Sequence, residues 1–266
     1  MSSDDIDEAI DWRGAPVDCS TCAHRDRLSD GRCKPLRACV HDRYARRIDR
    51  FFDWNPDLAG SYVTHPYFEV RACAAKAAEI FLLPALLSDP EEAVRWSAAR
   101  RLPRRYILKL RDDPHREVRI RIAGRLENTD LLPMMSDEDY AVRQAVAKRL
   151  PGDLLVLMIN DPDAGVRRIV ASRIAQAALM RLARDKDPVV RLEAAKRVEP
   201  SDLNALANDP DWRIRYEVAQ RADPKVVSSL AHDDDPLVRE CAAERLAIAG
   251  EQAPSNVIFA QTRSDP

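Results

Sequence analysis

The most constraining feature of the sequence is a pair of residues, Val or Ile followed by Arg, that recurs every 24 residues. The eight copies are Val70-Arg71, Val94-Arg95, Val118-Arg119, Val142-Arg143, Val166-Arg167, Val190-Arg191, Ile214-Arg215 and Val238-Arg239. No insertion interrupts the series. Equal spacings over this length predict a chain of stacked repeats, because one short repeat cannot bury its own apolar face.

Three other positions keep the same period. We call the Arg of each pair the anchor arginine. An alanine follows it by four positions in all copies, and a second arginine follows it by six positions in seven copies, from Arg101 to Arg245. An aspartate precedes it by six positions in seven copies, from Asp89 to Asp233, and the first copy has His65 instead. Each repeat therefore carries the same polar residues at fixed places.

The pattern within a repeat predicts a helix, a break and a shorter helix. Proline often follows the aspartate directly, and Asp-Pro is typical of a helix start, since the carboxylate caps and proline fits the first turn. Apolar residues four apart then predict a helix of about twelve residues. A second stretch has apolar residues three apart, which suits a 3₁₀ helix as well as an α-helix. Two repeats have the proline two residues later, at Pro188 and Pro236, which leaves their helix starts uncertain by about two residues.

The anchor arginine lies about 100° from the neighbouring Val on a helical wheel, inside the apolar arc. A charge at such a position needs a partner. The aspartate six residues earlier, in the same or the adjoining repeat, is the natural partner. We therefore predict a ladder of Asp and Arg that sets the register of the repeats. The alternative, a row of arginines that bind phosphate, would require exposed guanidinium groups.

The strings DPEEAVRWSAARRLP and DPVVRLEAAKRV carry a family resemblance. The Asp, six residues, Arg pattern is similar to that of HEAT repeats, but two full helices need a period of about 40 residues. Over roughly residues 60–250 the chain resembles instead the leucine-rich repeat variant family. The resemblance implies an all-α fold, a right-handed superhelical solenoid of eight repeats that each contain an α-helix and a short 3₁₀ helix. We predict this solenoid at residues 55–250, after a module at 1–54 and before a C-terminal tail at 251–266.

Four of the six cysteines lie ahead of the repeats, namely Cys19, Cys22, Cys33 and Cys39. The sequence shows no signal peptide or apolar membrane span, so we expect a cytoplasmic protein without membrane association. In that reducing compartment clustered cysteines bind metal more often than they form disulfides. The first two, spaced C-x2-C, can face one metal from a tight turn, and the other two can close the site from a loop. Four thiolates fit zinc or a four-iron cluster, and the spacing does not separate these alternatives.

The leucine-rich repeat variant family includes members whose N-terminal four-cysteine module carries a [4Fe-4S] cluster. The resemblance therefore implies that Cys19, Cys22, Cys33 and Cys39 are the metal ligands and cofactor-binding residues, with one cysteine on each iron. Zinc stays open as the alternative. His24 and His41 are expected to lie in solvent or around the ligands rather than to replace a cysteine.

Two further features favour structural roles. Aromatic residues gather between the module and the first repeat, where we expect them to cover the exposed end of that repeat; they are Phe51, Phe52, Trp54, Tyr62, Tyr67 and Phe68. Cys73 and Cys241 share one position of the repeat at opposite ends of the array, and we expect them to fill small packing spaces.

No catalytic motif is present, so we do not expect an enzyme. The first functional hypothesis is a scaffold that binds a partner protein on the solenoid surface, with the cluster in electron transfer, redox sensing or structure. The second is nucleic-acid binding, because residues 19–50 carry nine Lys and Arg against four Asp and Glu. The net charge of −2 and the expected Asp partners of the arginines count against it.

Overall fold

The computed structural model describes residues 8–251, and regular structure there is helical, with only isolated β-bridges besides. The chain divides into two compact units, Met1–Arg149 and Leu150–Pro266, which we describe one at a time. The predicted tail at 251–266 lies outside the described residues apart from Glu251, the last residue of α15. No helix among the described residues is both long and apolar enough to cross a bilayer.

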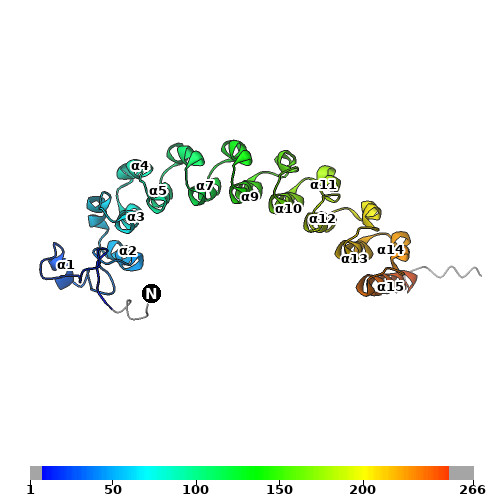
Figure 1. Cartoon of the computed structure of the whole chain (residues 1–266), viewed down its shortest axis with the longest axis horizontal. Helices are drawn as coiled ribbons and strands as arrows, with labels where there is room; N and C mark the ends of the chain where they lie inside the picture. Colours follow the sequence, from blue (N-terminus) through cyan, green and yellow to red (C-terminus); the bar gives the residue numbers. More distant parts are fainter. Residues whose placement is uncertain (1–7, 252–266) are drawn as a thin grey trace, which may run out of the picture. The chain divides into compact units, whose positions relative to one another are not determined.

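The first unit consists of the cysteine module and four repeats. Its elements are α1 (Arg25–Ser29), α2 (Ala45–Trp54), η2 (Pro56–Tyr62), α3 (Phe68–Ala77), η3 (Ile80–Leu82), α4 (Leu83–Leu86), α5 (Glu92–Ala99), α6 (Arg104–Ile107), η4 (Leu108–Asp112), α7 (Arg116–Ala123), α8 (Asn128–Leu131), η5 (Leu132–Ser136) and α9 (Tyr140–Arg149). The helices α3, α5, α7 and α9 form one layer, and the shorter helices form a second layer beside it (Figure 1).

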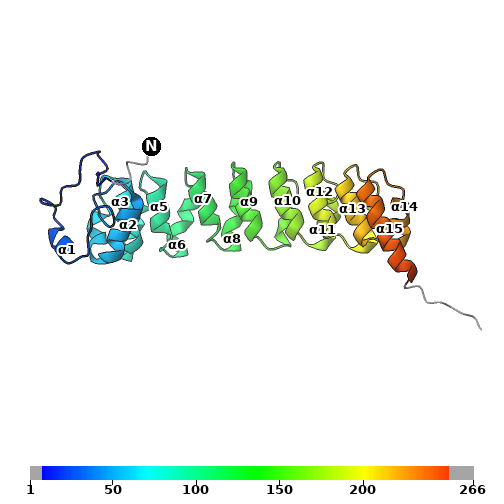
Figure 2. The same ribbon diagram turned by 90° about the horizontal axis from the view of Figure 1, so that it is seen from below.

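The second unit repeats the same design. Its elements are η6 (Leu154–Met158), α10 (Ala164–Arg173), α11 (Gln176–Leu182), α12 (Pro188–Ala195), η7 (Pro200–Leu206), α13 (Trp212–Arg221), α14 (Pro224–Leu230) and α15 (Pro236–Glu251). The helices α10, α12, α13 and α15 lie side by side (Figure 2). The predicted alternation of a helix with a shorter α or 3₁₀ segment is therefore confirmed in both units.

Small and branched side chains allow the long helices to pack closely. The Val or Ile before each anchor arginine is at most 1% exposed. The alanine four positions after it is fully buried in seven repeats, from Ala75 to Ala219. Because alanine adds little bulk, neighbouring helices can approach one another at this position, and the branched residue fills the space beside it.

The helix starts differ from the prediction. Each long helix begins three residues before its anchor arginine, so the starts at Pro188 and Pro236 are not shifted. The repeating aspartate is not the N-cap: Asp89 lies three residues before the start of α5, and its carboxylate accepts the backbone N–H of Glu91 at 2.9 Å. The aspartate therefore shapes the turn that precedes the helix, and both of its carboxylate oxygens also accept hydrogen bonds from Arg71.

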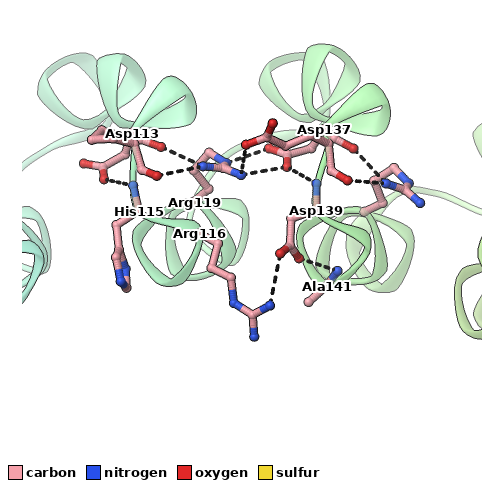
Figure 3. Close-up of polar contacts among 10 residues, drawn as sticks. Asp113, His115, Arg116, Arg119, Asp137, Asp139 and Ala141 are labelled. Carbon is pink, nitrogen blue, oxygen red and sulfur yellow. Dashed lines mark hydrogen bonds and ion pairs between the residues drawn. The ribbon is translucent and has the colours of Figure 1, made fainter.

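That other contact is the predicted ladder, with the partner in the adjoining repeat. Arg119 donates through Nε and Nη2 to the carboxylate of Asp137, at 2.8 and 3.0 Å, and through Nη1 to the backbone carbonyl of Asp113 at 2.8 Å (Figure 3). The same two-pronged ion pair recurs in both units at Arg71–Asp89, Arg95–Asp113, Arg167–Asp185, Arg191–Asp209 and Arg215–Asp233. Each anchor arginine in this set joins two successive loops and thereby fixes their spacing.

The second arginine of each repeat has a role that the sequence did not reveal. Arg197 reaches back to the preceding repeat, where its Nη1 and Nη2 donate to the carbonyl oxygens of Ala171 and Ile174, both at 2.7 Å. Arg221 does the same to Ala195 and Val198. The carbonyls of Ala171 and Ala195 lie in the last turn of α10 and α12, and those of Ile174 and Val198 lie just beyond these helices, so the guanidinium groups cap the helix C-termini.

Removing one such cap should cost stability without affecting the fold. We expect Arg197→Met to lower the free energy of unfolding by about 2 kcal/mol, because two carbonyls lose a charged donor. Lys196→Met is the matched control, since Lys196 is exposed and should change stability by less than about 0.5 kcal/mol. Urea unfolding followed by circular dichroism measures both variants, and equal stabilities would contradict the capping role.

The ladder also predicts how stability depends on pH. The hydrogen bond from Arg215 lowers the pKa of Asp233 below its ordinary value, which is about 3.9. The unfolded chain therefore binds a proton at this site at a higher pH than the folded chain does. The stabilisation is complete above about pH 5 and is lost as the pH falls through the lowered pKa. We expect the urea midpoint to be steady from about pH 7 to pH 5 and to fall below about pH 4, and a midpoint still steady at about pH 3 would contradict the account.

A degenerate repeat precedes the first one found in the sequence. Arg47 lies 24 residues before Arg71, and η2 starts 24 residues before η3. The helix α2 packs on α3 as α3 packs on α5. Its Phe51 and Phe52 are at most 1% exposed, so these two of the six predicted aromatic residues cover the end of the first repeat. The other four are partly exposed.

Candidate metal centre in the N-terminal module

The four candidate cysteines lie on a loop-rich segment that local turns shape. The carboxylate of Asp18 accepts from the backbone of Ser20 and from the hydroxyls of Ser20 and Thr21, which turns the chain just before Cys22. The helix α1 then spans part of the distance to Cys33. Between Cys33 and Cys39 the chain forms a tight loop closed by two backbone hydrogen bonds between Lys34 and Ala38, at 2.9 and 2.8 Å.

The four thiols interact with one another. The thiol of Cys39 donates to the sulfur of Cys33, and this hydrogen bond, together with burial, raises the pKa of Cys39, while the same bond lowers the pKa of Cys33. Burial raises the pKa of Cys19, and the nearby Cys39 and Cys22 raise it further. The structure therefore brings all four predicted residues into one region. Cys33 and Cys39 are buried, and Cys19 and Cys22 are partly exposed.

The chemistry of this donor set fits an iron–sulfur cluster. All four side chains are free thiols, and the backbone N–H groups of His24 and His41 donate to the sulfurs of Cys22 and Cys39. Such N–H···S bonds stabilise ligated thiolates. Within residues 8–251, however, no three His, Cys, Asp or Glu side chains are arranged so as to hold a single ion. The ligands are thus gathered in one region but not closed around one point.

The two histidines have other contacts. The Nε2 atom of His24 forms a hydrogen bond with the hydroxyl of Tyr62, and its ring lies 5.3 Å from that of Phe51 between centroids. Burial lowers the pKa of both His24 and His41, so both rings are neutral near pH 7. Burial also raises the pKa of Tyr62 to about 12. His24 therefore contacts the aromatic residues Tyr62 and Phe51 beside the cysteines.

The module is joined to the repeats through α2. The backbone N–H of Cys39 donates to the carbonyl of Arg47 at 3.1 Å, and the guanidinium of Arg47 pairs with the buried Asp42 at 3.0 Å. Arg32 bonds the carbonyl of Trp54 at the end of α2. The cysteine loop is thereby held against the helix that covers the first repeat.

Cys73 and Cys241 are buried in the repeats, as expected for packing residues.

These features define an all-helical repeat protein with an N-terminal cysteine module. The family model described as "LRV protein FeS4 cluster" matches residues 9–61, and the model for the leucine rich repeat variant matches residues 140–163. The module is thus of the family's iron–sulfur type.

A solved structure extends this likeness over most of the chain. It is entitled "A leucine-rich repeat variant with a novel repetitive protein structural motif" and is 39% identical, with a TM-score of 0.83. The match covers 86% of this chain and 99% of that one. The chain belongs to the leucine-rich repeat variant family and has its helical solenoid fold.

A curated relative is similar over a shorter stretch. The "uncharacterized 27.7 kDa protein in nifB 3'region" of Rhodobacter capsulatus is 48% identical over 96 residues. That match covers 36% of this chain and 39% of the relative, so the chain spans well under half of the relative's length.

Proposed function

We propose that Cys19, Cys22, Cys33 and Cys39 hold one [4Fe-4S] cluster, with one cysteine on each iron, and that the repeats serve as a scaffold for a partner protein. The observation that carries the proposal is the gathering of four interacting free thiols in the segment that matches the family's cluster module. A fully ligated cluster leaves no iron open for a substrate, so we do not assign a catalytic site.

When bound, the cluster would supply one-electron redox chemistry. The buried Cys33 and Cys39 would hold its inner side, and the partly exposed Cys19 and Cys22 its outer side. The N–H donors at Cys22 and Cys39 would lower the electron density on the sulfurs and raise the reduction potential. Electron transfer and redox sensing both suit this arrangement, and a reducing cytoplasm is the compartment that keeps the thiols available.

The arginines of the repeats already have hydrogen-bond partners, and this favours a protein partner over a nucleic acid. In the six ladder pairs named above, the anchor arginine already binds an aspartate, and second arginines such as Arg197 and Arg221 already bind carbonyls. Those guanidinium groups are not available for phosphate. The solenoid surface is therefore proposed as a protein-binding scaffold.

Anaerobic purification tests the cofactor. We expect a brown protein with a broad visible absorption band at about 400 nm that dithionite bleaches. A colourless protein with bound zinc would overturn the proposal in favour of the zinc alternative, because zinc has no redox chemistry and no such band.

A further inference from the structure

A basic hollow lies directly beside the cysteine loop. It has a volume of about 420 Å³ and is lined by Leu36, Tyr44, Arg46, Arg47 and Arg50. Leu36 comes from the loop between Cys33 and Cys39, and the other four residues come from the start of α2 and the residue before it. Because the N–H of Cys39 bonds the carbonyl of Arg47, the wall of the hollow is one hydrogen bond away from a proposed ligand.

Leu36 is unusual in both exposure and backbone conformation. Its side chain is 43% exposed, and its φ of 64° makes it the sole non-glycine residue with positive φ among residues 8–251. A leucine in this conformation is strained, and glycine or asparagine would be the ordinary choice. An exposed apolar side chain on the loop that joins two proposed ligands is well placed to contact another protein.

Four cations lie near this leucine, Lys34 and Arg37 on its own loop and Arg46 and Arg50 in the wall of the hollow. Within the described part of the chain, no ion pair involves Lys34, Arg37, Arg46 or Arg50, although Arg50 bonds the carbonyl of Arg37 and Arg37 lies over the ring of Trp54. The anchor arginines of the ladder pairs named above, in contrast, each bind an aspartate. Unpaired positive charge around a small apolar centre attracts an acidic surface and steers its approach.

We propose that this hollow is the docking site for an acidic electron-transfer protein, which places its acidic rim on the four cations and an apolar contact on Leu36. The proposal rests on the proposed cluster. With a cluster held by Cys19, Cys22, Cys33 and Cys39, the docked pair would pass one electron from a reduced [2Fe-2S]⁺ partner, which would be oxidised to [2Fe-2S]²⁺, to the oxidised cluster of this chain, which would be reduced by one electron. A small, charge-steered contact of this kind is typical of transient redox complexes.

Calorimetry on the iron-loaded chain tests the site, with an acidic plant-type [2Fe-2S] ferredoxin as the probe. We expect binding at low salt that weakens about tenfold or more when the salt concentration is raised from roughly 50 to roughly 300 mM. Arg46→Gln with Arg50→Gln should weaken binding about tenfold. Leu36→Asn, which suits the left-handed conformation, should weaken it several-fold without unfolding the loop.

The controls test whether binding depends on this particular set of cations. Arg181→Gln with Arg184→Gln removes two exposed arginines of the second unit and should bind the ferredoxin as the unchanged chain does. Equal loss in both double variants, or no loss in Arg46→Gln with Arg50→Gln, overturns the docking site.

Iron analysis of the same samples separates the two proposals. A chain without iron refutes the cluster and, with it, the role of this site in electron transfer. An iron-loaded chain that does not bind the ferredoxin refutes the docking site alone. An iron-loaded chain whose binding depends on Arg46 and Arg50 supports both.

Discussion

Replacing Asp113 by alanine is expected to lower the free energy of unfolding by about 3 to 5 kcal/mol, because it leaves a buried charge without its partner. Arg95 donates to both carboxylate oxygens of Asp113 at 2.7 Å, and the two residues are only 6% and 4% exposed. The substitution also removes the hydrogen bond that the backbone N–H of His115 donates to the carboxylate of Asp113 at 2.9 Å. Asp113 thus forms an ion pair with Arg95 and also stabilises the turn that precedes α7.

The neighbouring Asp112 provides a matched control. It is exposed and carries the same charge, so Asp112→Ala should change stability by no more than about 0.5 kcal/mol. A second comparison removes both partners. Arg95→Met with Asp113→Leu should recover much of the loss, since no unpaired charge is then left buried. Similar stabilities of Asp113→Ala and Asp112→Ala in urea would contradict the ladder.

Replacing Cys33 by serine is expected to leave less than about a tenth of the iron bound, because the cluster would lose a thiolate that the buried loop places on its inner side. The same change should destabilise the start of the first unit, since Cys39 and its loop are tied to α2 through the carbonyl of Arg47. Visible absorption and iron content measure the first effect, and hydrogen exchange of α2 measures the second.

Cys241→Ala is the control for the loss of a thiol as such. Cys241 is buried in α15 of the second unit, far along the sequence from the module. This variant should keep its iron and its absorption band. If Cys33→Ser were to retain full iron content, Cys33 would not be a ligand and the proposed set of four would be wrong.

The repeat, the helix alternation and the ladder were predictable because they depend on local periodicity and on the cost of burying an unpaired arginine. The helix starts were not. The carboxylate of Asp89 bonds Arg71, 18 residues earlier, as well as the N–H of Glu91, so it is committed to the preceding repeat and is not the cap of α5. The general preference of Asp-Pro for helix starts takes no account of this hydrogen bond to the preceding repeat.

The degenerate repeat at α2 was missed in the sequence because its residues depart from the repeat pattern at the diagnostic positions. Arg46 replaces the Val before the anchor, and Phe51 replaces the alanine four positions after it. Arg47 keeps the anchor position, but the residue 18 positions later is His65, so Arg47 pairs instead with Asp42. The 24-residue spacing from Arg71 back to Arg47 was the signal that could have revealed it.

The cysteines were identified by their spacing, and their shared region was predictable from it. The contacts that tune them were not, because they involve distant residues such as Tyr62, whose hydroxyl bonds His24 across 38 positions. The second arginines were visible as a period, but their carbonyl partners in the preceding repeat become evident only in the packed structure.

The composition of the metal centre is the most direct test of the proposed cluster. Iron, acid-labile sulfide and zinc are measured on the full chain after anaerobic purification. A [4Fe-4S] cluster on the four cysteines predicts about four iron atoms and about four sulfide ions per chain, with little zinc. About one zinc per chain without sulfide would contradict it.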